Sequence, residues 1–252
     1  MGSRWLIVAA GLLLLLSLSS ATRNVNALSL VDINTMILNA PANTVYFIYP
    51  DNDNSHPKCN PQSVGYAALS DWTAAGFIFG MLSNVPQNSV PDTRGTIVSP
   101  GSCAPVPSGK ALVLFGGPLV NSLVYYYELN RVSPVYWQLT GSWTTGTESW
   151  YTRDGAPIPG ATMSVQTLLG GHGDMFLVEV FQDANGNTVL AAYGFGGRGT
   201  FASGYYFKSV ISPNLASYGH AWYIFQWTDG ANGQPYDGFV QLNEITPVAQ
   251  GD

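Results

Sequence analysis

Charged residues are scarce in this chain. Nine Lys and Arg and fifteen Asp and Glu occur among 252 residues, so charged residues make up 10% of the sequence, against about 25% in an average globular protein. The formal net charge of −6 argues against a nucleic-acid-binding protein, which needs a basic surface. Hydrophobic residues reach 46%, enough to fill a core. With so few charges outside, we expect part of the surface to be buried against neighbouring molecules or to face an unusual solvent.

Signatures of hydrolases and nucleotide-binding proteins are also missing. There is no G-x-S-x-G and no H-E-x-x-H sequence. Gly194, Gly196 and Gly199 do form G-x-G-x-x-G, but no Asp or Glu follows between 200 and 228, where a dinucleotide site needs an acid for the ribose. A phosphate loop fails too, because Thr200 stands where lysine is required. We therefore predict no catalytic and no nucleotide-binding residues, and we interpret these glycines as positions where a helix packs closely on the sheet.

Two groups of polar residues leave enzyme chemistry open. His172 and Asp174 could act as a base and its orienting acid, but no motif ties a nucleophile to them, and a loop histidine before a strand is the plainer interpretation. Four carboxylates could supply the paired acids of a glycosidase: Glu128, Glu148, Asp174 and Glu179. Because the sequence gives no distance between them, a secreted hydrolase is the third-ranked function.

Residues 5–18 form the one long apolar run. Arg4 precedes this run of 14 residues and small residues follow it, a layout typical of a secretory signal peptide. The run is shorter than the roughly 20 residues that span a bilayer. We expect cleavage after Ala27, with Ala21 as the other candidate site and an uncleaved N-terminal anchor as the alternative. The mature chain, residues 28–252, is expected to be a single domain or two closely packed halves, with seven basic and fifteen acidic residues.

The chain contains two cysteines, Cys59 and Cys103. In an exported protein such a pair most simply forms one disulfide. Both cysteines lie in segments rich in Pro, Asn, Ser and Gly, at 51–63 and 84–109, which indicate long loops. We therefore predict a Cys59–Cys103 disulfide that joins two loops.

Strand and helix signals together predict an α/β fold with a mixed sheet. Unbroken apolar runs at 44–50 and 111–115 indicate strands that are buried on both faces. Helices are expected at 71–85 and 118–131, and residues 189–211 repeat the plan of strand, glycine turn and helix. Asn185 and Gly186 predict an antiparallel hairpin. Further strands are expected at 133–139, 161–169, 175–181, 220–227 and 238–242.

Residues 237–244, DGFVQLNE, match the second half of a calcium-binding loop. The first half departs from the pattern, because Gly233 and Pro235 stand where acids are needed. A plain solvated turn that leads into a strand is therefore the alternative to bound calcium. The ligands expected for calcium are Asp229, Asn232, Asp237, the carbonyl of Phe239, Gln241 and Glu244.

Three stretches resemble the archaeal surface-layer (S-layer) protein family, particularly its sheet-forming C-terminal region. They are ALVLFGGPLVN (111–121), MFLVEVFQDANGNTVLAAYGFGGRGT (175–200) and HAWYIFQWTDGANGQPYDGFVQLNE (220–244), about a quarter of the chain. The resemblance implies a cell-envelope protein that assembles laterally, often with calcium, and has no catalytic residues. Proteins of that family are usually larger and often glycosylated, whereas this chain has no N-x-[ST] sequon, so a small accessory or filament subunit is implied.

We therefore expect an extracellular structural protein that associates with itself or with other envelope proteins, and that contacts a membrane only through an uncleaved leader. The alternative is an extracellular carbohydrate- or peptide-binding module. Its exposed aromatics would come from the loop-like segment 141–155, namely Trp143, Trp150 and Tyr151.

Overall fold

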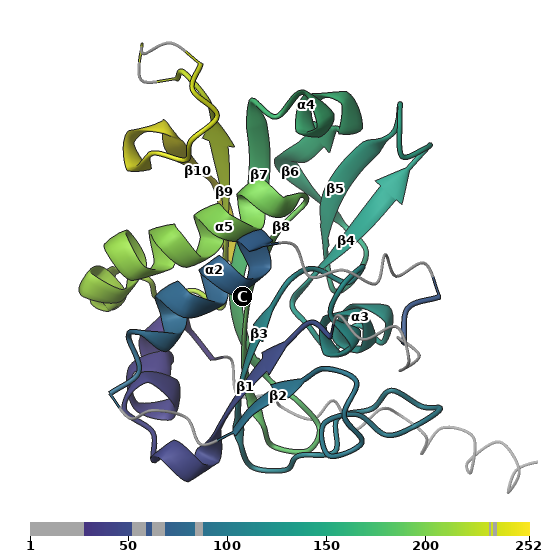
Figure 1. Ribbon diagram of the computed structural model, residues 1–252, viewed down its shortest axis with the longest axis vertical. Helices are drawn as coiled ribbons and strands as arrows, with labels where there is room; N and C mark the ends of the chain where they lie inside the picture. The colour runs from purple at the N-terminus through teal and green to yellow at the C-terminus, as the bar shows by residue number, and fades with distance from the viewer. Residues whose placement is uncertain (1–27, 52–58, 62–68, 84–87, 232, 234–235) are drawn as a thin grey trace, which may run out of the picture.

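The computed structural model describes residues 28–51, 59–61, 69–83, 88–231, 233 and 236–252. The predicted leader, 1–27, lies outside the described residues. In the described part of the chain, seven strands form one sheet in the order β10-β9-β7-β8-β3-β1-β2, and three form a second sheet, β4-β5-β6 (Figure 1). The strands of the large sheet are β1 (Val45–Tyr49), β2 (Asn88–Pro91), β3 (Ala111–Phe115), β7 (Gly173–Gln182), β8 (Thr188–Gly194), β9 (Trp222–Thr228) and β10 (Ile245–Gly251).

The large sheet is mixed. Strands β2, β1, β3 and β8 run parallel to one another, whereas β7 is antiparallel to both β8 and β9, and β10 is antiparallel to β9. Residues 183–187 join β7 and β8, so the hairpin predicted from Asn185 and Gly186 is confirmed. The predicted α/β fold with a mixed sheet is confirmed as well.

Other elements cover both faces of this sheet (Figure 1). One face carries α2 (Leu69–Phe79) and α5 (Gly197–Tyr206), together with the N-terminal turns η1 (Leu30–Asp32) and η2 (Asn34–Leu38). The opposite face carries α3 (Ser122–Leu129) and the small antiparallel sheet of β4 (Val135–Thr140), β5 (Thr147–Thr152) and β6 (Pro157–Ser164). The remaining helical segments are η3 (Ala42–Thr44), α4 (Val165–Gly170), η4 (Phe207–Ile211), η5 (Ser212–Ser217) and η6 (Leu242–Glu244).

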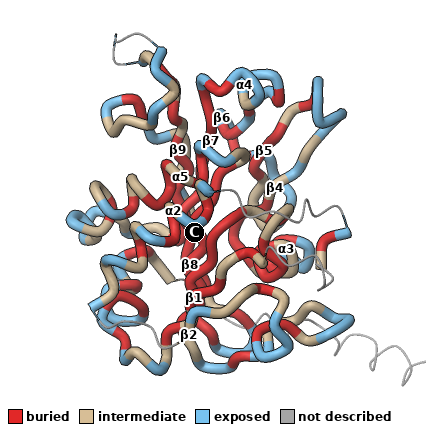
Figure 2. Tube along the Cα trace, in the orientation of Figure 1, coloured by how far each residue is buried: buried red, intermediate tan, exposed pale blue. Residues whose placement is uncertain are grey.

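Strand β3 shows why the apolar runs are unbroken. All five of its residues are buried, and Figure 2 shows the central strands buried along their length. Side chains alternate between the two faces of a strand. Accordingly Val113 and Phe115 belong to the cluster under α2 and α5, and Leu112 and Leu114 belong to the cluster with Trp150. The sheet therefore separates two apolar clusters.

Two helix boundaries differ from the sequence prediction. Helix α3 begins at Ser122, because the side chain of Asn121 accepts hydrogen bonds from the backbone N–H groups of Leu123 (3.0 Å) and Val124 (3.3 Å) and so caps the helix. Residues 118–121 form the connecting turn. Helix α2 ends at Phe79, where Gly80 leads into a turn.

Strand predictions were wrong in two places. The predicted strand 161–169 is strand only to Ser164, whose side chain accepts from the N–H of Thr167 (3.1 Å) and begins α4. The predicted last strand, 238–242, is not a strand, and β10 lies at 245–251 instead. Pro247 fits there because β10 is an edge strand with a bulge between Pro247 and Ala249. The sequence analysis also missed β2 and β5.

Glycines allow α5 to pack closely on its neighbours. A Cβ on Gly204 would lie 2.6 Å from the Cα of Ala74 in α2, far inside ordinary contact distance. A Cβ on Gly194, at the end of β8, would meet the backbone of Gly199 at the start of α5. The interpretation of these glycines as close-packing positions is therefore confirmed.

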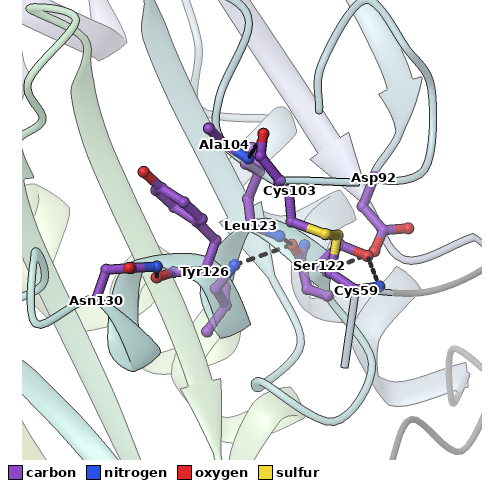
Figure 3. The surroundings of a disulfide bond; sticks show 11 residues. Cys59, Asp92, Cys103, Ala104, Ser122, Leu123, Tyr126 and Asn130 are labelled. Atoms are coloured by element: carbon purple, nitrogen blue, oxygen red, sulfur yellow. Dashed lines mark hydrogen bonds between the residues drawn. A yellow bond between two sulfur atoms is a disulfide. The ribbon is translucent and has the colours of Figure 1, made fainter. Parts of the chain in front are cut away.

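The disulfide predicted between Cys59 and Cys103 is present, with the two Cα atoms 5.8 Å apart. It lies beside the first turn of α3 (Figure 3), where the N–H of Cys59 donates to the hydroxyl of Ser122 (3.5 Å). The N–H of Ser122 donates in turn to Asp92 (2.6 Å). The disulfide thus joins two loops beside the start of α3, which follows the carboxyl end of β3.

Substitution of Gly204 with Ala should separate α2 from α5 and lower the melting temperature, because the added methyl group meets backbone that cannot move aside. A loss of about 2 kcal/mol or more in unfolding free energy is expected, as for other overpacked cores. The matched control is Gly76→Ala in the exposed face of α2, where a Cβ meets nothing within 4 Å. That variant should gain about 0.5–1 kcal/mol from helix propensity. Equal effects of the two substitutions in thermal unfolding would contradict this account.

Replacement of both Cys59 and Cys103 with Ser should destabilise the protein. The disulfide closes a loop over a sequence separation of 44 residues, which corresponds to roughly 4 kcal/mol of unfolding free energy in the chain-entropy model. Urea unfolding of the oxidised protein and of the double variant measures the difference. An unchanged unfolding midpoint would show that the disulfide does not restrain the unfolded chain.

Candidate functional site

The connections that follow β3 and β8 leave the sheet on opposite faces. These strands are neighbours and parallel, but β3 leads to α3 on one face and β8 leads to α5 on the other. A crevice opens at the carboxyl ends of two strands where such connections diverge, and in open α/β sheets this is where ligands usually bind. The candidate functional site is therefore the crevice above β3 and β8.

One cavity lies at this edge of the sheet, and a second lies between α3 and β4. The first, of about 200 Å³, is lined by the turn after β3, the turn after β8, Asp71 of α2 and the ring of Trp137 of β4. The second, of about 210 Å³, is lined by Glu128 and Arg131 at the end of α3 and by Gln138 of β4. Trp137 and Pro118 line both cavities. We call the two cavities together the Trp137 groove.

The backbone N–H groups of the glycine turn point at a carboxylate of the protein itself. Asp174 of β7 is buried, and its two carboxylate oxygens accept from the N–H of Gly196 (3.1 Å) and of Gly199 (2.6 Å). Burial raises the pKa of Asp174 to about 6, although these two bonds oppose the rise. The G-x-G-x-x-G turn therefore uses its N–H groups to bind an internal acid at the start of α5.

Glu128 joins three elements behind the groove. Its carboxylate accepts from the hydroxyl of Tyr193 in β8 and from the backbone N–H of Trp137 in β4 (3.0 Å). Burial raises the pKa of Glu128 to about 8, and the bonds from Tyr193 and Trp137 and the charge of Arg131 oppose the rise. Glu128 therefore ties the small sheet to the large one.

Glu179 and Glu148 hold the same strand. Glu179 of β7 accepts from the N–H of Val135 (3.3 Å), and burial together with the nearby Glu128 raises its pKa. Glu148 of β5 accepts from the indole N–H of Trp137 (2.8 Å), and burial raises its pKa to about 7. Each of the four carboxylates that the sequence analysis singled out thus accepts hydrogen bonds from the protein.

His172 and Asp174 do not form a pair of catalytic base and orienting acid. The ring of His172 is 2.8 Å from Asp229, measured from Nδ1 to Oδ2, and Asp174 is bonded to the glycine turn instead. The base-and-orienter interpretation is therefore wrong for these two residues.

The acids of the expected calcium loop bind the loop's own N–H groups. Asp229 accepts from the N–H groups of Asp237 (3.2 Å) and Gly238 (3.0 Å). Asp237 accepts from the N–H of Phe239 (2.8 Å) and the side chain of Gln241 (3.0 Å).

Glu244 of the same loop is turned to the protein interior, where it accepts from the indole of Trp227 (2.9 Å) and the N–H of Gly230 (2.8 Å). Asn232 lies outside the described residues. Within those residues, no group of three or more His, Cys, Asp or Glu side chains is arranged to hold a metal ion. Calcium binding at this loop stays a prediction.

The aromatic residues of 141–155 are not one exposed surface. Trp150 is fully buried, and its ring stacks on Phe195 with ring centroids 4.7 Å apart, so its expected exposure was wrong. Trp143 is 47% exposed and stacks on Trp137 (5.8 Å between centroids). Tyr151 stacks on Tyr136 on the small sheet. The sequence analysis missed Trp137 and Tyr193, because nothing in a predicted strand shows which ring lies at a cavity.

Comparison of the chain with protein family models, curated proteins and solved structures finds no match. Among the helices of the described ranges, none combines the length and the apolar character that a membrane span requires.

The buried acids should make the stability of the protein fall as the pH rises. The folded protein keeps the proton of Glu128 up to a pKa of about 8, compared with 4.5 for an unperturbed carboxyl. This contribution to the unfolding free energy is complete below pH 4.5 and is lost as the pH rises through 8. Each unit of pKa elevation corresponds to about 1.4 kcal/mol, so a loss of several kcal/mol is expected.

Urea unfolding at pH 5, 7 and 9 measures this dependence. Glu128→Gln, which keeps one acceptor and cannot ionise, should flatten the curve, whereas the control Asp154→Asn, at an exposed acid, should leave it unchanged. A wild-type unfolding free energy that is constant or rises from pH 5 to pH 9 would refute this interpretation.

Proposed function

We propose that this protein is an exported structural protein of the cell envelope that associates with copies of itself. The observation that carries the proposal is the burial of most of its acids, which leaves a surface with very little charge. Nine acids of the described residues are buried: Asp71, Asp92, Glu128, Glu148, Asp174, Glu179, Asp183, Asp229 and Glu244.

Few charged side chains remain on the outside. Among the described residues, the charged residues in the exposed class are Arg94, Arg131, Asp154, Arg198, Lys208, Asp237 and Asp252. Burial also raises the pKa of Glu128 to about 8, so the negative charge at neutral pH is smaller than the formal value. Net charge far from zero keeps proteins monomeric through mutual repulsion. The surface itself carries few charged side chains, so few of them have to be desolvated when copies make close lateral contact.

Large apolar side chains are exposed on the same molecule. Leu69 at the start of α2 is 83% exposed and Phe239 is 73% exposed, and together with Phe201 of α5 they line a cavity of about 550 Å³. Exposed apolar groups that gather around one hollow typically mark a protein contact. We propose this hollow as a contact for a second copy of the chain.

Three further points support an envelope location. The disulfide is consistent with an oxidising, extracellular compartment. The signal-peptide pattern predicts export, and the resemblance to S-layer proteins implies lateral assembly. Calcium at the 229–244 loop belongs to the same proposal and would be measured by calorimetric titration of the purified protein.

Self-association is tested with the purified mature protein at rising concentration, by light scattering and electron microscopy, between pH 5 and 8 and with and without calcium. We expect ordered sheets or filaments. The double variant Leu69→Lys and Phe239→Lys should remain monomeric, because it places charge in the apolar hollow. Asn214→Lys, which adds a charge at an exposed position elsewhere, is the matched control and should assemble normally. A wild-type protein that stays monomeric under every condition would contradict the proposal.

A further inference from the structure

We infer that the second cavity of the Trp137 groove, between α3 and β4, binds a small organic monocarboxylate through the guanidinium group of Arg131. This inference goes beyond the proposed function and does not depend on it, because the apolar hollow of Leu69 and Phe239 is a separate cavity. Three features of the cavity support it: the hydrogen-bond donors that remain free, the backbone conformation of Arg131 and the charge of the surrounding wall.

The cavity contains hydrogen-bond donors that the protein does not use. Within the part of the chain that the structure describes, the guanidinium group of Arg131 has no hydrogen-bond acceptor. The same holds for the side-chain amide of Gln138, which is exposed at the cavity wall. Glu128 and Asn60 also line the cavity, but their side chains are bonded to the protein. The groups that remain free are mainly donors, which an anion satisfies.

The guanidinium group of Arg131 is held in place by aromatic rings. Its central carbon lies 3.0 Å from the centroid of the Tyr136 ring, and Tyr136 stacks on Tyr151 with ring centroids 5.3 Å apart. A guanidinium group that lies over an aromatic ring keeps the N–H groups in its own plane available for other partners. A carboxylate accepts two parallel hydrogen bonds from this planar fork. The stack therefore pre-organises Arg131 for a carboxylate.

Arg131 occupies a backbone position that favours glycine. It follows the end of α3 with a φ of 54°, and its N–H donates to the carbonyl of Glu128 (3.1 Å), so it ends the helix in the left-handed conformation. Among the described residues, Cys103 is the only other non-glycine residue with a positive φ, and the disulfide holds it. A side chain at such a position costs free energy relative to glycine. Ending the helix does not account for an arginine here, whereas binding through its side chain does.

The charge around Arg131 fits an anion with a single negative charge. Among the described residues that line the cavity, Arg131 is the only cation and Glu128 the only acid. Burial raises the pKa of Glu128 to about 8, which reduces the negative charge there at neutral pH. Glu128 and Leu129 belong to the last turn of α3, and the carbonyl end of a helix carries partial negative charge, which disfavours a doubly charged phosphate. One carboxylate therefore matches the one guanidinium group.

The rest of the wall fits a small apolar body. Tyr125, Leu129 and Trp137 line the cavity beside Pro118, and its volume is about 210 Å³. This volume is below the roughly 300–1,000 Å³ of sites that take drug-sized ligands, so it suits a single aromatic or aliphatic group. A free organic acid and the C-terminal residue of a peptide both present such a group next to a carboxylate. These are the two sources of the same ligand chemistry.

Calorimetric titration of the purified mature protein at neutral pH tests the inference. Benzoate represents a free organic acid, and N-acetyl-phenylalanine represents the end of a peptide. Each acid is paired with its amide, which keeps the apolar body and loses the charge. At least one acid should bind saturably with a Kd of about 1 mM or lower, and its amide should bind at least tenfold more weakly. The acid that binds more tightly identifies the source of the ligand.

Three variants connect the binding to Arg131. Arg131→Gln removes the guanidinium group and should weaken binding of the acid at least tenfold. Arg131→Gly, which the left-handed position accommodates without strain, should weaken binding to the same extent. The matched control Arg94→Gln removes an exposed cation elsewhere and should bind like the wild type. Circular dichroism confirms the fold of each variant.

Four outcomes would overturn the inference. They are no saturable binding of either acid, equal binding of an acid and its amide, equal binding by the Arg131 variants and the wild type, and tighter binding of inorganic phosphate than of both acids. The self-association assay on Arg131→Gln separates this inference from the proposed function. That variant should still assemble, whereas failed assembly of a wild-type protein that binds an acid would remove the proposed function alone.

Discussion

Hydrogen bonds from backbone N–H groups to buried carboxylates hold this fold together where its strands and helices end. Burial of a carboxylate costs free energy unless hydrogen-bond donors surround it. The first N–H groups of a helix have no partner within the helix. A buried carboxylate placed beside such N–H groups therefore supplies the missing acceptor and gains the donors that it needs. The same contact recurs at the start of α3, along β4, in the β7–β8 hairpin, at the start of α5 and in the last loop. The acids concerned are Asp92, Glu128, Glu179, Asp183, Asp174, Asp229 and Glu244.

This use of acids has two consequences. Fewer charged side chains lie on the surface. Burial also raises the pKa of Glu128, Glu148 and Glu179. The low surface charge is the basis of the proposed self-association, and the raised pKa values make the stability depend on pH.

The same contacts shape the groove. Asp174 takes the N–H groups of the glycine turn, and Glu128 and Glu179 take those of Trp137 and Val135. The crevice itself follows from topology, since β3 and β8 send the chain to opposite faces of the sheet.

The sequence by itself determined the features that depend on local pattern or on a simple count. Apolar runs such as ALVLF, the Asn185-Gly186 turn and a pair of cysteines predicted the buried parallel strands, the hairpin and the disulfide. It did not determine where α3 begins or where the last strand lies, because a side-chain cap and an edge position decided them. Only the tertiary structure decided the partners of the acids and the place of Trp137 at the groove. Those contacts join residues tens of positions apart, as in Gly199 and Asp174, and their distances follow from packing that no local pattern records.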